Sequence, residues 1–234
     1  MSAATHPVGP PVDLTPAELP GPVMLAGRSG SVARLSAARD TSDLWQALLG
    51  HDEVWTYMSY GPFAEERSFA ACLAEREALK DPYSYSVRDN DGHALGLVTL
   101  MAIRPAMRVV EVGNIVYSPA LQRTPLATET QYLLARYVFE TLGYRRYEWK
   151  CDSLNAPSRR AALRYGFLFE GIFRQHMIVK ARNRDTAYFS MLDSEWPVRK
   201  RNFQRWLAPD NFDREGRQKL SLAALNGAES ARRA

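Results

Sequence analysis

The sequence predicts an α/β fold (α+β mixed sheet), with a central, mostly antiparallel sheet flanked by helices in a single domain with a C-terminal arm. Residues 83–104 read as two strands around Asn90-Asp91-Gly92, and an Asp-Gly pair suits a tight antiparallel turn. After Tyr117 the spacing of apolar residues changes from two to 3.6 and then changes back. This alternation predicts a sheet whose strands are connected by helices, and these helices lie on the faces of the sheet.

The composition is that of a globular protein. The 234 residues are 46% hydrophobic, which is enough for one sizeable core. Residues 1–20 hold five prolines and no long apolar run, so we expect a flexible leader and neither a signal peptide nor a membrane partner. Two cysteines and four scattered histidines without ligand spacing predict a cytoplasmic protein with no metal site.

Positive charge is concentrated at the C-terminal end. The net charge is +4, whereas residues 198–234 alone carry nine Lys/Arg against four Asp/Glu. We therefore expect a main domain over residues 21–197 and a basic helical arm over 198–234. Clustered cations can bind RNA phosphates, but we interpret this cluster as a solvated helix face and do not expect nucleic acid as a partner: Arg199, Lys200, Arg201 and Arg205.

The first half of the chain predicts two strands, two helices and a hairpin. Each of these elements is predicted from the spacing of its apolar residues and from the turn or cap residues at its ends. The elements, in order, are two short strands within Val23–Leu35, a helix from the cap residues 40–42 to Gly50, an aromatic loop over 54–63, a helix over 64–79, and the strands Tyr83–Asp89 and Ala94–Arg104.

The second half predicts an alternation of strands and helices. Gly143 and Gly166 each follow a predicted helix, as is typical of helix ends. The elements are the strand Val109–Tyr117, the helix Leu126–Leu142, the strand Tyr147–Cys151, the helix Ala156–Tyr165, and the strands Leu168–Val179 and Thr186–Leu192 joined by a turn over 180–185. Apolar residues of the arm are available to pack back on the domain: Trp196, Phe203, Trp206 and Leu207.

Three aromatic residues lie in the loop before the second helix. Trp55, Tyr57 and Tyr60 are placed where loop side chains often line a binding pocket. They are candidates for binding a substrate. Covering the core beneath the loop is an equally good explanation.

The loop after Tyr117 has the setting of an anion site, because a strand, a loop and a helix N-terminus follow one another. It reads Gln122-Arg123-Thr124-Pro125-Leu126-Ala127-Thr128. This run resembles the pyrophosphate-binding motif of the GNAT family, Gln/Arg-x-x-Gly-x-Gly/Ala, in which Gln122 and Ala127 match. Pro125 stands where glycine is usual, and proline lacks the N–H that would bind phosphate.

A second segment carries the resemblance further. Asn155-Ala156-Pro157-Ser158, followed by Gly166-Phe167 and Glu170-Gly171, resembles the segment that ends the GNAT cofactor site. The chain from Val23 to Pro197 is most similar to the RimJ/RimL-like branch, N-terminal acetyltransferases of ribosomal proteins and relatives that modify other amines. The resemblance implies a GNAT N-acetyltransferase with acetyl-CoA as its acyl donor.

The resemblance also implies roles for particular residues. The strand Val109–Tyr117 should separate from the strand Tyr147–Cys151 and offer its backbone to the pantetheine arm. Ala162 stands where many GNAT enzymes have a tyrosine acid, so Ser158 is the candidate acid or thiolate hydrogen-bond donor, although capping the local helix explains it equally well. The expected cofactor contacts are Ile115, Val116, Tyr117, Gln122, Arg123, Thr124, Ala127, Thr128, Asn155 and Ser158.

Glu111 is the candidate general base. An ammonium group has no lone pair, so the acceptor must lose a proton before it attacks the thioester. Glu111 lies in an apolar strand beside the expected acyl site. A salt-bridged strand residue is the alternative interpretation.

The expected reaction is direct attack of a primary amine on acetyl-CoA, because neither cysteine has a partner that would favour a covalent intermediate. Protein N-termini and small-molecule amines fit equally as acceptors. Two alternatives stay open, namely a catalytically weak acyl-CoA-binding or sensing module, and a protein-modifying factor docked on RNA or the ribosome. A homodimer is compatible with the predicted strand edges.

Overall fold

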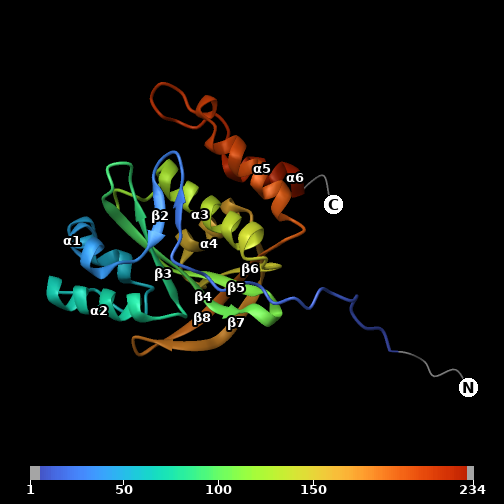
Figure 1. Cartoon of the computed structure of the whole chain (residues 1–234), viewed down its shortest axis with the longest axis horizontal. Helices are drawn as coiled ribbons and strands as arrows, with labels where there is room; N and C mark the ends of the chain where they lie inside the picture. The colour runs from blue at the N-terminus through green and yellow to red at the C-terminus, as the bar shows by residue number, and fades with distance from the viewer. Residues whose placement is uncertain (1–5, 231–234) are drawn as a thin grey trace, which may run out of the picture.

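The centre of the protein is one eight-stranded sheet with strand order β1-β2-β3-β4-β5-β6-β8-β7 (Figure 1). The computed structural model describes the backbone of residues 6–230 and the side chains of residues 6–227. All neighbouring strands are antiparallel except β5 and β6. The predicted mixed, mostly antiparallel sheet is confirmed. The strands are β1 (Met24–Ala26), β2 (Ser31–Arg34), β3 (Tyr83–Arg88), β4 (Ala94–Arg104), β5 (Val109–Tyr117), β6 (Arg146–Asp152), β7 (Leu168–Val179) and β8 (Arg182–Leu192).

Helices cover both faces of the sheet (Figure 1). On one face α1 (Ala37–Leu48), η1 (Asp52–Trp55) and α2 (Glu66–Ala78) enclose a small core with Leu97 of β4. On the other face α3 (Pro125–Arg136) and α4 (Ala156–Tyr165) cover the larger core, to which the next residue of β4, Val98, belongs. The alternation of side chains along a strand therefore supplies both cores. The shorter helical segments are η2 (Pro105–Met107), the π-helical η3 (Tyr137–Thr141) and η4 (Pro209–Asn211).

The helix α1 begins earlier than the sequence predicts. Ser36 occupies the N-cap position, and residues 40–42 lie inside the helix. The side chain of Asp40 is buried, accepts a hydrogen bond from the Ser36 N–H (3.0 Å), and forms ion pairs with Arg39 (2.7 Å) and Arg88. An acid that reaches back to the cap N–H satisfies the same donor as a capping box, so the predicted cap is a first-turn residue.

The strand β8 also begins earlier than predicted. It starts at Arg182 and not at Thr186, because the connecting turn is only Lys180 and Ala181. Both turn residues have positive φ angles, 48° and 59°, which a two-residue hairpin turn requires. Residues other than glycine rarely adopt these angles, and the polar run 182–185 therefore resembles a longer loop in the sequence.

The C-terminal arm packs on the domain. It contains α5 (Trp196–Leu207) and α6 (Leu222–Ser230), which lie over α3 and α4 (Figure 1). Phe203 stacks on Tyr165 of α4 with ring centroids 6.1 Å apart, and the guanidinium of Arg164 lies 4.8 Å from the centre of a Trp206 ring. Trp196, Phe203 and Trp206 are buried in the larger core.

The N-terminal segment has no regular secondary structure over residues 6–20, and its end is tied to the domain. The Ala17 N–H donates to the Pro105 carbonyl (3.1 Å) and the Glu18 N–H to the Leu142 carbonyl (2.8 Å). Residues 1–5 of the predicted leader and 231–234 of the predicted tail lie outside the described residues. The division into 1–20, 21–197 and 198–234 stays a proposal.

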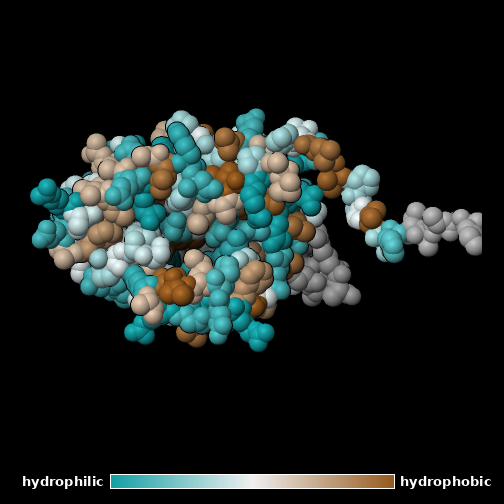
Figure 2. All heavy atoms as spheres, turned by 90° about the horizontal axis from the view of Figure 1, so that it is seen from below, coloured by the Kyte–Doolittle hydropathy of each residue, from teal (hydrophilic) through white to brown (hydrophobic). Residues whose placement is uncertain are grey.

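At one edge of the sheet β7 exposes a series of large apolar side chains. Figure 2 views the molecule from below, the side on which β7 and β8 lie in Figure 1, and shows hydrophobic residues interspersed with polar ones. The exposed residues are Leu168, Phe169, Ile172, Phe173, Met177 and Ile178.

Candidate active site

The strands β5 and β6 pair over only four residues of each strand, from Val109–Arg146 to Val112–Trp149. Beyond that point β5 continues to Tyr117 beside β4 alone, and a bulge with a positive φ at Asn114 (46°) bends it. The backbone of residues 113–117 is therefore not paired with β6. The predicted separation of the two strands is confirmed.

The loop after β5 ends in a well-capped helix. Gln122 Nε2 donates to the Tyr117 carbonyl (2.9 Å), and Thr124 Oγ1 accepts a hydrogen bond from the Ala127 N–H (3.2 Å). Pro125 is the first residue of α3, where a backbone N–H would have no partner within the helix. The substitution of glycine by Pro125 therefore fits the helix start, and the dipole of α3 favours an anion at this position.

Asn155 and Ser158 lie in the first turn of α4, and both are engaged locally. Asn155 is the N-cap, and its Oδ1 accepts a hydrogen bond from the Ser158 N–H (3.1 Å). The Ser158 Oγ accepts one from the Trp149 indole N–H (3.0 Å), and the hydroxyl also contacts Cys151. Burial raises the pKa of the Cys151 thiol. Ser158 thus keeps a hydroxyl proton to donate, while the Asn155 side chain retains its NH₂ group.

No tyrosine occupies the position seven residues beyond Asn155. Ala162 is fully buried there. Tyr165, three residues later, packs in the core between Trp149 (5.9 Å) and Phe203 (6.1 Å). Tyr165 is therefore a packing residue of α4.

Glu111 lies where β5 and β6 begin to separate, and its side chain is almost completely buried. Its Oε2 is 3.0 Å from Lys150 Nζ, which also contacts Glu148 Oε2 at 2.9 Å. Burial raises the pKa of Glu111, and the charge of Lys150 opposes this shift. Glu111 is both an ion-paired strand residue and a carboxylate whose pKa is displaced towards neutrality, as a general base requires.

The ion-pair network extends from Lys150 across the sheet. Glu148 is bound by Arg146 (2.7 Å) and Arg104 (3.1 Å), and Arg146 also binds Glu170 (2.5 Å). Burial opposes ionisation of Glu148, but Arg146 and Lys150 hold its pKa below the usual value. The hydrogen bonds from Arg146 lower the pKa of Glu170 to about 2. Every carboxylate of this network therefore has a cation beside it.

The three loop aromatics have different environments. Trp55 is buried and packs on the edges of Phe63 and Phe69. Tyr60 lies under the guanidinium of Arg76 (3.6 Å), and burial raises its pKa to about 12. Tyr57 is partly exposed, and its hydroxyl donates to the carbonyl of Leu154 (3.2 Å), next to Asn155. Only Tyr57 joins the loop to the first turn of α4.

The hairpin of β7 and β8 adds side chains that no sequence pattern identified. Lys150 Nζ lies 5.0 Å from the ring centre of Tyr188. The Tyr188 ring stacks on Phe173 with centroids 4.0 Å apart, and its hydroxyl is hydrogen-bonded to His176 Nε2 (3.3 Å). At the tip Lys180 Nζ donates to the Trp55 carbonyl (2.9 Å). These contacts depend on the register of β6, β8 and β7, which sequence does not reveal.

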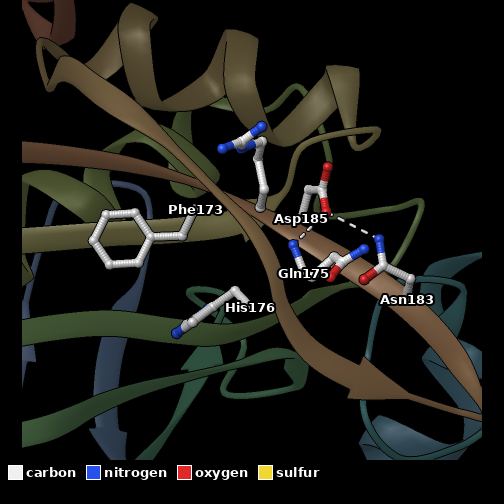
Figure 3. A pocket seen from close by; sticks show the side chains of 6 residues that line it. Phe173, Gln175, His176, Asn183 and Asp185 are labelled. Carbon is white, nitrogen blue, oxygen red and sulfur yellow. Dashed lines mark hydrogen bonds between the residues drawn. The ribbon is translucent and has the colours of Figure 1, made fainter.

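A bulge in β7 opens a pocket beside these residues (Figure 3). Gln175 has a φ of 49°, and its N–H donates to Asp185 Oδ1 (2.8 Å), which also accepts from Asn183 (2.9 Å). Phe173 and His176 point to one side of the ribbon, and Gln175, Asn183 and Asp185 to the other (Figure 3). The pocket is linked to Lys150 through the contacts of His176 with Tyr188 and of Tyr188 with Lys150. It is lined by Phe173, Arg174, Gln175, His176, Asn183 and Asp185.

Residues 6–230 show neither a metal-binding cluster nor a membrane-spanning helix. No cluster of three or more His, Cys, Asp or Glu side chains is arranged to hold a metal ion in this range. Nor does any helix in the described part of the chain have the length and apolar character needed to cross a membrane.

Comparison with known proteins identifies the family. Residues 33–168, more than half of the chain, match the family described as Acetyltransferase (GNAT) domain. A GCN5-related N-acetyltransferase from Brucella melitensis is 45% identical with a TM-score of 0.89, over 91% of this chain and 98% of that one. A GNAT-family structure from Chromobacterium violaceum, named for acetyltransferase activity, is 42% identical with a TM-score of 0.76, over 82% of this chain and 100% of that one.

A curated relative is matched over a shorter segment. YdaF of Bacillus subtilis, named as a candidate ribosomal N-acetyltransferase, is 29% identical over 106 residues. The match covers 45% of this chain and spans 57% of that relative. Because the family match and the similar structures agree with the separated strands and the fold, the chain belongs to the GNAT family of N-acetyltransferases.

Proposed function

We propose that the protein transfers an acetyl group from acetyl-CoA to a primary amine by direct attack in a ternary complex. The observation that carries this proposal is the position of Glu111, a buried carboxylate held by Lys150 at the point where β5 and β6 separate. A base is needed there because the acceptor amine is protonated at neutral pH.

The residues around the separated strands fit acetyl-CoA. The backbone of Ile115, Val116 and Tyr117 is not paired with β6, so it can bind the pantetheine amides as an added strand would. The loop formed by Gln122, Arg123 and Thr124 leads into the first turn of α3 with Ala127 and Thr128, where N–H groups and the helix dipole favour the pyrophosphate. The Asn155 NH₂ group can bind the pantetheine near its sulfur.

Bound acetyl-CoA would supply an activated acetyl thioester. Glu111 accepts a proton from the acceptor ammonium, which frees the nitrogen lone pair for attack on the thioester carbonyl. A backbone N–H near Val116 polarises that carbonyl. The hydroxyl of Ser158 donates a hydrogen bond or a proton to the departing thiolate. The acetyl group ends on the nitrogen, which loses two protons in all. Glu111 takes up the first before the attack, and the second, lost as the amide forms, balances the proton that the thiolate gains at Ser158, so that coenzyme A leaves as the thiol.

The acceptor that we propose is a small-molecule amine or the N-terminus of a protein or peptide. The resemblance to the RimJ/RimL-like branch supports a protein N-terminus, and the name of YdaF, a candidate ribosomal N-acetyltransferase, is compatible with it. Of the three loop aromatics proposed for acceptor binding, Tyr57 is the partly exposed one beside α4, whereas Trp55 and Tyr60 act through the packing of the loop.

A coupled assay tests the proposal. Purified protein is incubated with acetyl-CoA and single amines, thiol release is followed, and the product is examined by mass spectrometry. We expect release that depends on the amine and a product that gains one acetyl group. Saturable acetyl-CoA binding without transfer to any amine would instead support the sensing module.

Replacing Lys150 with methionine tests how Glu111 is kept ionised. Removing this cation takes away the main charge that opposes the effect of burial and raises the pKa of Glu111 further. Because a base works only when deprotonated, the acid limb of the kcat/KM profile should move to higher pH. Glu148 keeps Arg146 and Arg104 as partners, so the sheet should stay folded.

The matched control is Lys200→Met, which removes the lysine paired with Glu140 away from the site. Its pH profile should equal that of the wild-type protein. An unchanged profile in Lys150→Met would show that Glu111 does not limit the reaction.

Replacing Ser158 with alanine tests the thiolate hydrogen bond. Loss of one hydrogen bond to a charged group costs about 1.5–3 kcal/mol, which corresponds to a decrease of roughly 10- to 100-fold in kcat. The KM for acetyl-CoA should change little. Trp149→Phe is the control, since it removes the indole donor to Ser158 and keeps the hydroxyl. Equal losses in both variants would assign Ser158 a packing role alone.

The RNA-docking alternative has less support than the transferase. Within the basic cluster Arg199 is buried and Lys200 pairs with Glu140 (2.8 Å), so Arg201 and Arg205 are its exposed members. We also propose a cytoplasmic location, which the two free cysteines support, and a homodimer, for which the exposed apolar side chains of β7 offer an edge.

A further inference from the structure

Arg184 of β8 lies on the same face of the sheet as Glu111. Along β8, Thr186 is opposite Asp152 and Tyr188 is opposite Lys150, and side chains of alternate residues share a face. Arg184 is two residues before Thr186. It therefore belongs to the face that carries Lys150 and its ion pair with Glu111, at the level where β6 ends.

The guanidinium of Arg184 reaches back towards the proposed base. Its charge lowers the pKa of Glu111 on β5, of Cys151 on β6 and of Tyr188 on β8, although burial has the larger effect on each of the three. No ion pair within 4.0 Å joins Arg184 to Glu111 among the described residues. The guanidinium thus shares a face with Glu111 and acts on its charge, but it lies beyond ion-pair distance from the Glu111 carboxylate.

Arg184 is only partly exposed, and it has an unused donor. Its Nε is buried and meets no hydrogen-bond acceptor among the residues that the structure describes. A buried donor of a charged group without a partner costs free energy. A carboxylate would satisfy it, because the planar guanidinium binds carboxylates through two parallel hydrogen bonds.

The acidic groups of the same face are already compensated. Glu111 and Glu148 share Lys150, and Glu170 binds Arg146. Asp152, opposite Thr186 on this face, accepts a hydrogen bond from the Leu154 N–H (2.8 Å). Asp185, the neighbour of Arg184, belongs to the other face and is held by the Gln175 N–H and by Asn183. Near the proposed base the face thus offers an unpaired positive charge and no carboxylate without a partner among those named.

We propose that the acceptor is a primary amine that also carries a carboxylate, with the amine at Glu111 and the carboxylate bound by Arg184. This inference rests on the proposed acetyl transfer and names its substrate class. A polycationic amine is disfavoured, because its second ammonium group would meet the positive charge of Arg184.

Matched acceptors test the proposal. The kcat/KM is measured for glycine, β-alanine and 4-aminobutyrate, for the primary amide of each, and for spermidine. We expect at least one acid to exceed its amide by roughly 10- to 100-fold, as for one hydrogen-bonded charge pair, and spermidine to be poor. Arg184→Gln should abolish this preference through KM, and Arg184→Lys should restore part of it.

Arg182→Gln is the control, because Arg182 is exposed on the same strand. It should keep the preference, and the Arg184 variants should keep the wild-type Tm, since no partner is lost. Equal rates for acids and amides, or spermidine as the best acceptor, would overturn the inference and leave the transferase standing. An equal loss of kcat/KM for acids and amides in Arg184→Gln, together with a shift of the acid limb of the pH profile, would overturn the inference too. Arg184 would then act by keeping Glu111 ionised and not by binding a carboxylate of the acceptor. Acetyl-CoA binding without transfer to any amine would overturn the proposed function and this inference together.

Discussion

Replacing Glu111 with glutamine is expected to lower kcat by about 10²- to 10⁴-fold, the usual contribution of a general base. Glutamine has nearly the same shape and cannot accept the proton of the acceptor ammonium. Burial raises the pKa of Glu111, so the wild-type acid limb should lie above the ordinary range of a carboxylate. That limb should disappear in the variant. Steady-state thiol release against pH measures both effects.

The matched control for Glu111 is Glu148→Gln. Glu148 shares Lys150 with Glu111 and lies opposite it on β6. The Glu148 variant removes one negative charge from the same network and leaves the proposed base in place. We expect it to keep most of its kcat at high pH. An equal loss in both variants would show that charge balance, and not proton transfer, explains the effect of Glu111.

Replacing Phe203 with alanine is expected to destabilise the protein by about 3–5 kcal/mol, as for other buried phenylalanines. Phe203 is fully buried and packs on Tyr132 (5.8 Å) and Tyr165 (6.1 Å). Urea denaturation gives the free energy of unfolding of this variant and of Arg201→Ala, an exposed control on the same helix. Similar values for the two variants would mean that the arm contributes little to the core. The expected loss means that truncation at residue 197 would disrupt the domain.

Local sequence signals predicted those elements whose ends are set by nearby residues. The strand β5 and the helix α4 have the predicted bounds, because a break in period at Tyr117 and a glycine at 166 mark them. The predicted start of α1 was wrong, since the side chain of Asp40 forms a long-range ion pair with Arg88 and does not cap the helix as its first residue. The start of β8 was wrong because Lys180 and Ala181 adopt glycine-like angles.

The candidate site was predictable only in part. Glu111, Asn155 and Ser158 were nominated from an apolar strand and from motif spacing. Lys150, Tyr188 and Arg184 were not, because their positions relative to Glu111 arise from the register of β5, β6 and β8. Pairing across a sheet brings together residues that are far apart in sequence, and no local pattern encodes it.

Calorimetric titration with acetyl-CoA tests the central claim most directly. The separated strands and the N-terminus of α3 should bind acetyl-CoA saturably with one site per chain, and Glu111→Gln should bind it with unchanged affinity, because Glu111 is assigned to the acceptor. Coenzyme A and longer acyl-CoAs serve as comparators. Absence of binding to every acyl-CoA would contradict the account, since the loop with Pro125 would then not accommodate the donor.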